Sequence, residues 1–511
     1  MKNMKSVGAW AALLVVGAVW AGEPQATLVV TVDAGKTLGP IRAMNAVNNG
    51  PTVAPVLGDQ KRGNFVDYRA ARIPYARLHD SVGCVSGGAH AVDVSAVFPD
   101  FEADENDPKN YDFVFTDHYL DTIRRAGTEV FYRLGQTIEH GPKKYGVLPP
   151  KDPAKWARIC EHIIRHYNEG WGWGADTAVT TRNIAWSNQF NIVYWEIWNE
   201  PDLDGSDLEP PANPRTWGGT VTNFFEFYTT AAKHLKERFP GLRIGGPALC
   251  GNEDWAKRFL AYCHEHEVPV DFFSWHCYAE EPKWIADKCV RMRKIIDEAG
   301  YPQAESILNE WSYVKGWTDD WVYTLEVESG RLNQKMAAFI AATMIDCQHA
   351  PLDMLMYYDA RADAVMNGLF DHTTLNPKRG YYPYLAWSRL VDLGEEIACD
   401  LRESRGTRSN AATGVPVGDW CKGGDAKGTF RAVAAKGKDG RQAVMIVRYS
   451  RDDNVSDTAT AWLVAPGADF SRARCHVTDA YRLYTEVPLV TEPDGSAMIR
   501  IPPNSFVIVE W

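Results

Sequence analysis

The chain lacks the features that mark a nucleic-acid-binding protein. It has no run of basic residues, and among its 511 residues the acidic side chains outnumber the basic ones by 66 to 54, for a formal net charge of -12. A surface of that sign repels phosphate backbones, so we expect no nucleic acid partner. Low-complexity segments are also absent, and 45% of the residues are hydrophobic, which predicts a globular protein with a large core.

Metal-binding and redox motifs are missing as well. The ten cysteines include no CxxC pair. His264 and His266 stand close to Cys263, but their spacing matches no zinc motif, so we expect neither a metal nor a cofactor. Several cysteines, such as Cys160 and Cys347, fall inside periodic helical stretches, as buried thiols do.

Long hydrophobic runs are confined to the N-terminus. Lys2 and Lys5 precede an apolar stretch over about residues 7–19, and the small residue Ala21 follows it. This pattern is typical of a secretory signal peptide, so we expect residues 1–21 to be removed and the protein to be secreted or periplasmic; an uncleaved anchor is the alternative. No other segment reaches about 18 consecutive apolar residues, which predicts no membrane span after cleavage.

From about residue 72 to 393, short apolar runs alternate with amphipathic stretches, the pattern of a parallel sheet covered by helices. Strands are predicted at residues 41–49, 71–80, 129–135, 191–202, 242–249, 271–278, 306–313 and 352–360. Eight such units form a (β/α)8 TIM barrel, an α/β fold that we place at residues 40–395. No GxGxxG motif follows the first strand, which argues against a dinucleotide-binding fold.

Beyond residue 395 the hydrophobic period changes to two. Asp439-Gly440 and Asp494-Gly495 each separate two apolar runs, which is the signature of β-hairpins. We therefore expect an antiparallel β-sandwich domain over residues 396–511. Residues 22–39 should add an N-terminal strand to it, because an isolated strand leaves its backbone groups unpaired.

Polar residues end several of the predicted barrel strands. They are Arg77, His79, Asp80, Asn199, Glu200, Asp202, His276, Tyr278, Asn309, Glu310, Asp359 and Arg361. All strand carboxyl ends of a barrel open on one face, so these side chains should converge there. A single polar residue at a strand end often only caps a helix, but the coincidence across five strands favours a functional site.

Two Asn-Glu pairs stand out, Asn199-Glu200 and Asn309-Glu310, at the ends of the fourth and seventh predicted strands. Both glutamates follow apolar strands, where a charge is costly unless it is paired or functional. Paired carboxylates suit glycosidic bond cleavage: one donates a proton to the leaving oxygen, and the other meets the positive charge at the anomeric carbon.

Within this pair, a neighbouring ionised Glu310 should raise the pKa of Glu200 and leave Glu200 protonated as the acid. Three other glutamates fit less well. Glu196 lies in the middle of a strand, and Glu280 and Glu281 begin a helix, where acidic residues ordinarily face the helix dipole.

The segments WEIWNEPD (195–202) and LNEW (308–311) resemble the acid/base and nucleophile motifs of the retaining glycoside hydrolases of clan A. Within that clan the chain is most similar to glycoside hydrolase family 39, which holds β-xylosidases and α-L-iduronidases. ARLHD (76–80) and SWHCY (274–278) support the resemblance. One departure is Asn309, since the family often has Thr or Ser before its nucleophile.

The resemblance implies a role for each matched residue. It makes Glu200 the acid/base, Glu310 the nucleophile and Asn199 the donor to the sugar 2-hydroxyl. It also implies a set of supporting residues: Arg77, His79, His276 and Tyr278.

The expected substrate is an oligosaccharide or polysaccharide with a neutral sugar, β-xyloside first. A neutral sugar needs hydroxyl-directed hydrogen bonds and aromatic contact, which Tyr278 and Trp311 could supply. A uronic acid needs a fixed cation, for which Arg361 is the strong candidate. We place Arg361 and Asp359 at the substrate, but Arg361 is close in sequence to both Asp359 and Asp363, and a salt bridge with one of them is favoured.

Insertions over residues 84–109 and 170–191 favour a walled pocket and therefore an exo mode of cleavage. Three alternatives stay open: an endo-acting clan A glycanase, an α-L-iduronidase-like uronidase, and a carbohydrate-binding barrel without turnover. The sequence leaves the oligomeric state open.

Overall fold

The computed structural model describes most of the chain from residue 27 onward. The described ranges are 27–52, 63–81, 84, 90–173, 190–204, 206–316, 333–362, 367–371, 373–402 and 429–511, with backbone alone for 403–404, 408–409, 416–417 and 420–422. The predicted signal peptide, residues 1–21, lies outside the described residues.

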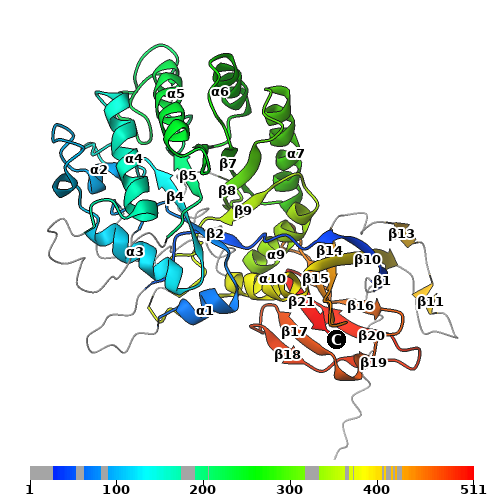
Figure 1. Ribbon diagram of the computed structural model, residues 1–511. Coiled ribbons are helices and arrows are strands. Elements are labelled where there is room, and N and C mark those ends of the chain that lie inside the picture. The colour runs from blue at the N-terminus through cyan, green and yellow to red at the C-terminus, as the bar shows by residue number, and fades with distance from the viewer. Residues whose placement is uncertain are drawn as a thin grey trace, which may run out of the picture.

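The larger part of the molecule is a closed barrel of parallel strands (Figure 1). Its strands are β2 (Ala46–Asn48), β3 (Tyr75–Arg77), β4 (Glu129–Leu134), β5 (Tyr194–Ile197), β6 (Arg243–Leu249), β7 (Phe272–Ala279), β8 (Glu305–Tyr313) and β9 (Met354–Tyr357). Each strand pairs in parallel with the next, and β2 pairs with β9 to close the ring. The predicted (β/α)8 barrel is confirmed.

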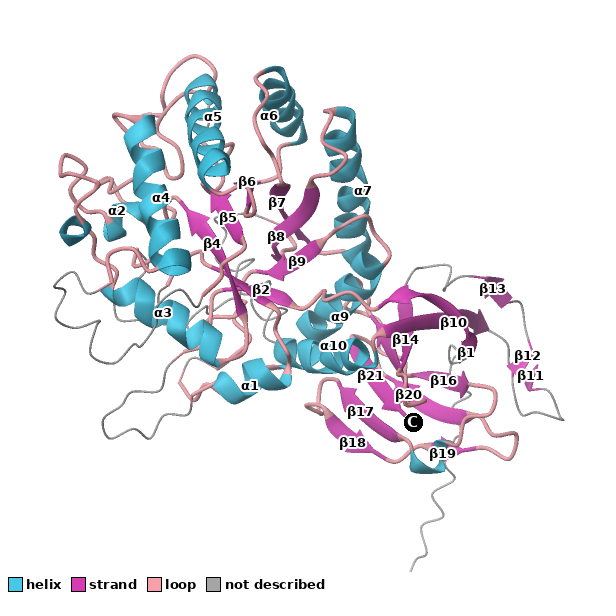
Figure 2. Ribbon diagram, in the orientation of Figure 1, coloured by secondary structure: helices cyan, strands magenta, loops and turns pink. Residues whose placement is uncertain are grey.

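Helices surround these strands (Figure 2). They are α1 (Phe65–Ala70), α2 (Val94–Val97), α3 (Val114–Arg125), α4 (Pro153–Glu169), α5 (Val221–Arg238), α6 (Glu253–Glu265), α7 (Pro282–Glu298), α9 (Gln334–Gln348) and α10 (Tyr382–Leu393), with short 3₁₀ helices at Pro108–Asn110 and Arg379–Tyr381. A third 3₁₀ helix, Phe470–Arg472, belongs to the second domain. Local sequence sets the limits of α4: the Asp152 side chain accepts hydrogen bonds from the first turn, and Gly170 ends the helix with a φ of +78°.

Several barrel strands are shorter than the sequence predicts. β2 has 3 residues within the predicted 41–49, and β5 has 4 within the predicted 191–202. β5 ends early because the following turn holds Trp198 and Glu200 in the left-handed region, with φ of +78° and +49°. Non-glycine residues in that region are held there by their surroundings, often at functional sites. Glu200 therefore lies on a loop rather than on the strand.

The barrel interior has two zones of different chemistry. Near the amino ends of the strands it is filled by one apolar cluster: Ala46, Phe131, Phe272, Ile307, Met354 and Met356. Two or four strand positions further on, the buried interior side chains become polar: Asn48, Arg77, Glu196, Ser274, His276 and Asn309. The apolar layer thus closes the floor below a polar layer at the carboxyl-terminal mouth.

The second domain is a predominantly antiparallel β-structure. Its strands are β1 (Thr27–Pro40), β10 (Glu395–Ser404), β11 (Arg408–Ser409), β12 (Pro416–Val417), β13 (Trp420–Lys422), β14 (Phe430–Lys436), β15 (Gln442–Arg448), β16 (Ala459–Val464), β17 (Arg474–Thr478), β18 (Thr485–Val487), β19 (Val490–Thr491), β20 (Ala497–Ile501) and β21 (Ser505–Glu510). The N-terminal strand β1 pairs antiparallel with β10 and parallel with β16, so it belongs to this domain as the sequence predicts.

The two layers of this domain come from one continuous sheet. Its hydrogen-bonded order is β18-β17-β21-β15-β14-β10-β1-β16-β20-β19, with β13 paired to β10. Leu28 of β1, Ile499 of β20 and Val509 of β21 share one apolar core although they are distant in that order. The sheet therefore folds over itself, and its inner face supplies the core.

Strand β15 contributes to the hydrophobic cores of both domains, because its successive side chains point to opposite faces. Val444 and Ile446 point into the core of the β-domain, whereas Met445 and Val447 belong to the barrel's hydrophobic cluster together with residues of α9 and α10. Figure 1 shows α9 and α10 between the barrel and this sheet. Among the described residues, none of the helices combines the length and the apolar character needed to span a membrane.

Candidate active site

The polar residues predicted at the strand ends meet at the carboxyl-terminal mouth of the barrel. Hydrogen bonds join Arg77 of β3, Asn199 and Glu200 after β5, His276 and Tyr278 of β7, and Glu310 of β8. Arg77 and Glu310 are 233 positions apart in sequence and lie within hydrogen-bond distance. The closed barrel makes this possible, because it brings all strand carboxyl ends to one face.

Glu310 has a donor on each carboxylate oxygen. Arg77 Nη1 donates to Oε1 at 2.8 Å, and the Tyr278 hydroxyl donates to Oε2 at 2.8 Å. Nε2 of His79 lies 3.6 Å from Oε1. Burial raises the pKa of Glu310, while the Arg77 charge and the Tyr278 hydrogen bond act in the opposite direction. These two donors favour the ionised carboxylate, which is the form a nucleophile needs.

A β-bulge in β8 makes Glu310 face the barrel interior. Asn309 is an extra residue in β8 relative to both β7 and β9. Strict alternation would put Asn309 and Glu310 on opposite faces of the strand. With the bulge both point inward, where Asn309 donates to Glu196 and Glu310 accepts from Arg77.

Glu200 has a less polar environment. Its backbone N–H donates to the Ala248 carbonyl at 2.9 Å, and its Oε1 lies 2.7 Å from His276 Nδ1. Burial raises the pKa of Glu200 to about 7, against smaller opposing effects of the Arg77 charge and a hydrogen bond with Cys250. From the sequence we expect the charge of Glu310 to cause this rise. In the structure, loss of water around the carboxyl group is the main cause instead.

His276 lies between the two glutamates. Its Nδ1 is 2.7 Å from Glu200 and 3.4 Å from Glu310. Burial lowers the pKa of His276 to about 4, and burial also lowers that of His79 well below its usual range, so both rings are neutral near pH 7. A neutral ring adds no positive charge beside the glutamates.

His276 and the two glutamates beside it are also residue types that bind metal ions. One ligand atom each from Glu200, His276 and Glu310 lie within 4.8 Å of one another. A cation bound there would lie beside the Arg77 guanidinium, which already donates to Glu310, and the two like charges would repel each other.

The side-chain amide of Asn199 has a hydrogen-bonded oxygen and a nitrogen without a partner among the described residues. Its Oδ1 accepts from Arg77 Nη2 at 2.7 Å, which orients the amide. Its Nδ2 is buried and has no hydrogen-bond partner among the described residues. A buried donor left in this state costs about 1–3 kcal/mol, so a ligand hydroxyl would satisfy it.

Arg361 and Asp359 form an ion pair at the end of β9. Arg361 Nε donates to Asp359 Oδ2 at 2.8 Å, and the guanidinium also contacts Asp80. The predicted salt bridge to Asp359 is thus present; Asp363, the other predicted partner, lies outside the described residues. Two carboxylates neutralise this cation.

Trp311 does not join the group around Glu310. It is fully buried and contacts Phe339 of α9 and Tyr357 of β9. Successive residues of a strand point to opposite faces, so the inward orientation of Glu310 already directs Trp311 toward the helices. The structure therefore places this predicted substrate contact in the hydrophobic core.

Three further polar residues complete the site: Asn48 and Ser274, which the sequence does not indicate, and Glu196, which it ranks below the two paired glutamates. Asn48 accepts from Arg77 Nη1 at 3.0 Å, and Glu196 and Ser274 hydrogen-bond each other at 2.6 Å inside the barrel. The available signal for Glu196 is a carboxylate within an apolar strand. For Asn48 and Ser274 the sequence offers no signal beyond their position near a strand end.

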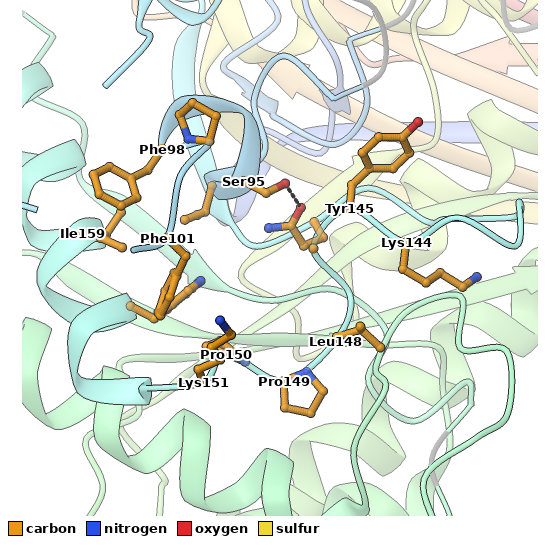
Figure 3. A pocket seen from close by; sticks show the side chains of 15 residues that line it. Ser95, Phe98, Phe101, Lys144, Tyr145, Leu148, Pro149, Pro150, Lys151 and Ile159 are labelled. Carbon is orange, nitrogen blue, oxygen red and sulfur yellow. Dashed lines mark hydrogen bonds between the residues drawn. The ribbon is translucent and has the colours of Figure 1, made fainter. Parts of the chain in front are cut away.

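A cavity of about 210 Å³ lies beside the loop that follows β4 (Figure 3). Phe98 and Phe101 supply aromatic walls, and Ser95 donates to Gln136 at 2.7 Å at its edge. The predicted substrate-binding residues are not among the described residues that line it. This cavity is distinct from the group around Glu310.

One buried glutamate follows the fourth strand of a (β/α)8 barrel and another lies on the seventh, and the two have different environments. This arrangement defines a class, the barrel glycoside hydrolases. The family model described as "Glycosyl hydrolases family 39" matches residues 30–359. The chain belongs to this family, as the sequence resemblance implies.

Curated relatives match over part of their length. A β-xylosidase from Geobacillus stearothermophilus is 28% identical over 194 residues, which cover 36% of this chain and 34% of that protein. A β-xylosidase from Caldicellulosiruptor saccharolyticus is 25% identical over 271 residues, which cover 49% of this chain and 48% of that protein. The matched parts thus span from about a third to about half of these relatives.

Among solved structures, a glucosidase from Croceicoccus marinus has a TM-score of 0.69 at 21% identity, and the match covers 95% of this chain and 98% of that one. This likeness shows that the fold, including the β-domain, is shared.

Proposed function

We propose that this chain is a retaining, exo-acting glycoside hydrolase that releases a neutral sugar, with β-xylosides as preferred substrates. The observation that supports this best is the pairing of Glu200 and Glu310. Carboxyl groups of retaining enzymes lie about 5–5.5 Å apart and those of inverting enzymes about 6.5–9.5 Å. Here one oxygen of Glu200 and one of Glu310 lie within 4.8 Å of each other, and this short separation supports retention rather than inversion.

In the first step, the Glu310 carboxylate attacks the anomeric carbon while Glu200 donates its proton to the leaving oxygen. The environments of the two groups match these roles. Arg77 and Tyr278 hold the Glu310 carboxylate in place, and burial keeps the proton on Glu200 up to about pH 7. Positive charge that develops on the sugar ring faces the ionised carboxylate.

In the second step, Glu200 takes a proton from water, and the water attacks the anomeric carbon to release the sugar. Formation of the glycosyl ester removes the charge of Glu310, and less negative charge near Glu200 lowers the pKa of Glu200. The same residue can therefore act first as an acid and then as a base. The unpartnered Nδ2 of Asn199 supplies a donor for the sugar 2-hydroxyl.

The choice of a neutral sugar rests on Arg361. A uronate carboxylate needs a cation that is free to pair with it, and Asp359 and Asp80 already bind this guanidinium. The two curated relatives named β-xylosidases point to xylose among neutral sugars.

A panel of nitrophenyl xyloside, galactoside, glucoside, arabinoside and iduronide tests the proposal on purified protein. We expect the highest kcat/KM on the β-xyloside. The variant Arg361→Lys should rank the neutral sugars by kcat/KM in the same order as the parent. Dominant iduronide activity that collapses in Arg361→Ala would overturn the neutral-sugar assignment.

The exo mode is proposed from the length of the insertion over residues 84–109, which includes α2. Xylan digestion followed in time distinguishes the modes. An exo enzyme releases xylose from the first minutes while chain length hardly changes, and an early fall in chain length would indicate an endo enzyme.

The pH dependence of kcat/KM should follow the two carboxyl groups. Activity is expected to fall as pH rises through about 7, because Glu200 then loses the proton that it must donate. It should fall again at low pH, where Glu310 takes up a proton. Initial rates on a xyloside with a poor leaving group between pH 4 and about 9 measure both limbs.

The matched control is Glu200→Ala on an activated substrate whose leaving group needs no proton. The limb near pH 7 should then disappear while the acid limb remains. Persistence of the upper limb in this variant would show that another group is responsible for it.

We also propose export, on the basis of Lys2, Lys5 and the apolar stretch that follows. Fractionation of an expressing cell should find the protein outside the cytoplasm, shortened to a start near Gly22. Full-length protein in the cytoplasm would contradict this.

A further inference from the structure

A buried carboxylate, Glu196, lies at the centre of the polar layer of the barrel. It is fully buried on β5, four residues before Glu200. Arg77 Nε donates to its Oε2 at 2.6 Å, the Ser274 hydroxyl donates to its Oε1 at 2.6 Å, and Asn309 Nδ2 also donates to Oε1. One side chain thus connects four barrel strands: β3, β5, β7 and β8.

The partner of Glu196 is the residue that contacts both motifs of the active site. Arg77 uses Nε for Glu196, Nη1 for Glu310 and Asn48, and Nη2 for Asn199. A guanidinium is a rigid planar fork, so an anchor on one edge sets where the remaining donors point. Glu196 therefore determines the position from which Arg77 holds the catalytic groups.

Glu196 also supports the bulge that turns Glu310 inward. Asn309, the extra residue of the bulge, donates to Glu196 through its side chain, and its backbone carbonyl accepts from Asn48 Nδ2 at 2.6 Å. Both hydrogen bonds tie the bulge to the barrel interior.

The charges of these buried groups do not cancel. With Glu200 protonated, Arg77 carries one positive charge, and Glu196 and Glu310 carry one negative charge each, which leaves one surplus negative charge. If Glu196 were neutral, Arg77 would balance Glu310 completely. The surplus charge favours a positively charged sugar at the transition state, because buried charges interact more strongly than they do in water.

We propose that Glu196 is a positioning residue of hydrolysis: it anchors Arg77 and the Asn309 bulge, and it cancels the Arg77 charge so that the charge of Glu310 remains available to the sugar. This inference rests on the proposed function and extends it to a residue that does not touch substrate.

If Glu196 and Arg77 formed only an ordinary ion pair of the core, their loss would affect stability and not catalysis. The barrel contains a second buried ion pair that serves as a control. Arg133 Nη2 and Asp93 Oδ1 lie 2.6 Å apart, and both side chains are fully buried. Asp93 contacts Thr137 and His90 and neither catalytic glutamate. Arg133 Nη2 also donates to the His79 carbonyl, so the pair is broken at Asp93, which leaves Arg133 in place and reports the cost of a buried ion pair.

Other charged or titratable groups also face the catalytic glutamates and must be kept constant in the comparison. They are His276, Tyr278, His79, Tyr358, Cys250, Asp202, Asp204 and Arg215, besides Arg77 and the two glutamates themselves. None of them is altered in the variants below.

The test is Glu196→Gln, which keeps the length and an acceptor oxygen but removes the charge. We expect kcat to fall by about 10²-fold with KM changed by no more than about threefold, as for a small misplacement of catalytic groups. The upper limb of the pH profile should move to lower pH, because loss of the Glu196 charge leaves the Arg77 charge, which lowers the pKa of Glu200, without its partner. Asp93→Asn should lower the melting temperature and leave that limb in place.

Glu196→Asp separates position from charge and remains informative if the glutamine variant does not fold. It keeps the charge but is too short to reach Arg77 in the same geometry. We expect a lower kcat with an unmoved upper limb. A glutamine variant with parental kcat and pH profile, or an aspartate variant with parental kcat, would overturn the inference. A parent without activity on any glycoside would instead refute the proposed function.

Discussion

Glu310→Ala is expected to abolish turnover almost completely, with kcat lower by roughly four to six powers of ten, the scale seen when a covalent nucleophile is removed from other hydrolases. The physical reason is that no other described carboxylate receives both the Arg77 and the Tyr278 hydrogen bonds. Steady-state rates on an activated xyloside, with circular dichroism to verify folding, measure this loss.

Added azide makes this result specific. With Glu310 removed, azide can occupy the space of the lost carboxylate and attack the anomeric carbon, so the glycosyl azide formed should have inverted configuration. Glu305→Ala, at the amino end of the same strand β8, is the matched control and should keep its turnover. Near-parental activity of folded Glu310→Ala would refute the assignment of the nucleophile.

Glu200→Ala is expected to show a loss that depends on the leaving group. For a xyloside with a poor leaving group kcat should fall by about 10²–10⁴-fold, the usual contribution of general acid catalysis. For an activated leaving group the first step needs no proton and should stay fast, so that hydrolysis of the glycosyl ester becomes limiting. Pre-steady-state bursts on the two substrates measure this difference.

Azide distinguishes the two glutamates here as well. In Glu200→Ala it should replace water in the second step and give a glycosyl azide of retained configuration. His276→Asn, which removes the ring between the glutamates but leaves both carboxyl groups, should reduce rates without this dependence on the leaving group. If the configurations of the azide products were exchanged between the two glutamate variants, the roles of acid and nucleophile would be exchanged too.

Much of the site can be predicted from local sequence. The polar residues at the strand ends are recognisable because they interrupt apolar runs, and a closed barrel collects all such ends on one face. For that reason Arg77, His276, Tyr278 and the two glutamates are found without any knowledge of distances. Local composition is a poor guide to strand limits: the predicted strand covers residues 191–202, but β5 ends at Ile197 and the apolar Trp198 already lies outside the sheet.

Other features depend on orientation, which composition does not encode. Trp311 next to Glu310 looks like a substrate contact, yet it packs against Phe339 in the helix layer. Strand alternation predicts this orientation of Trp311 once Glu310 is known to point into the barrel. Glu196 looks like a poor catalytic candidate because it lies in mid-strand, and its importance becomes visible through its contact with Arg77.

The sequence by itself determined the barrel, the additional β-domain with its N-terminal strand, and the pair of Asn-Glu motifs. These follow from periodicity, turn residues and costly charges, which are properties of short segments. Tertiary structure alone decided the bulge at Asn309 that turns Glu310 inward, the cause of the raised pKa of Glu200, and the anchoring of Arg77 by Glu196. The physical reason is that each of these depends on the distance between side chains on different strands, or on how completely neighbouring strands exclude water, and the closure of the barrel sets both.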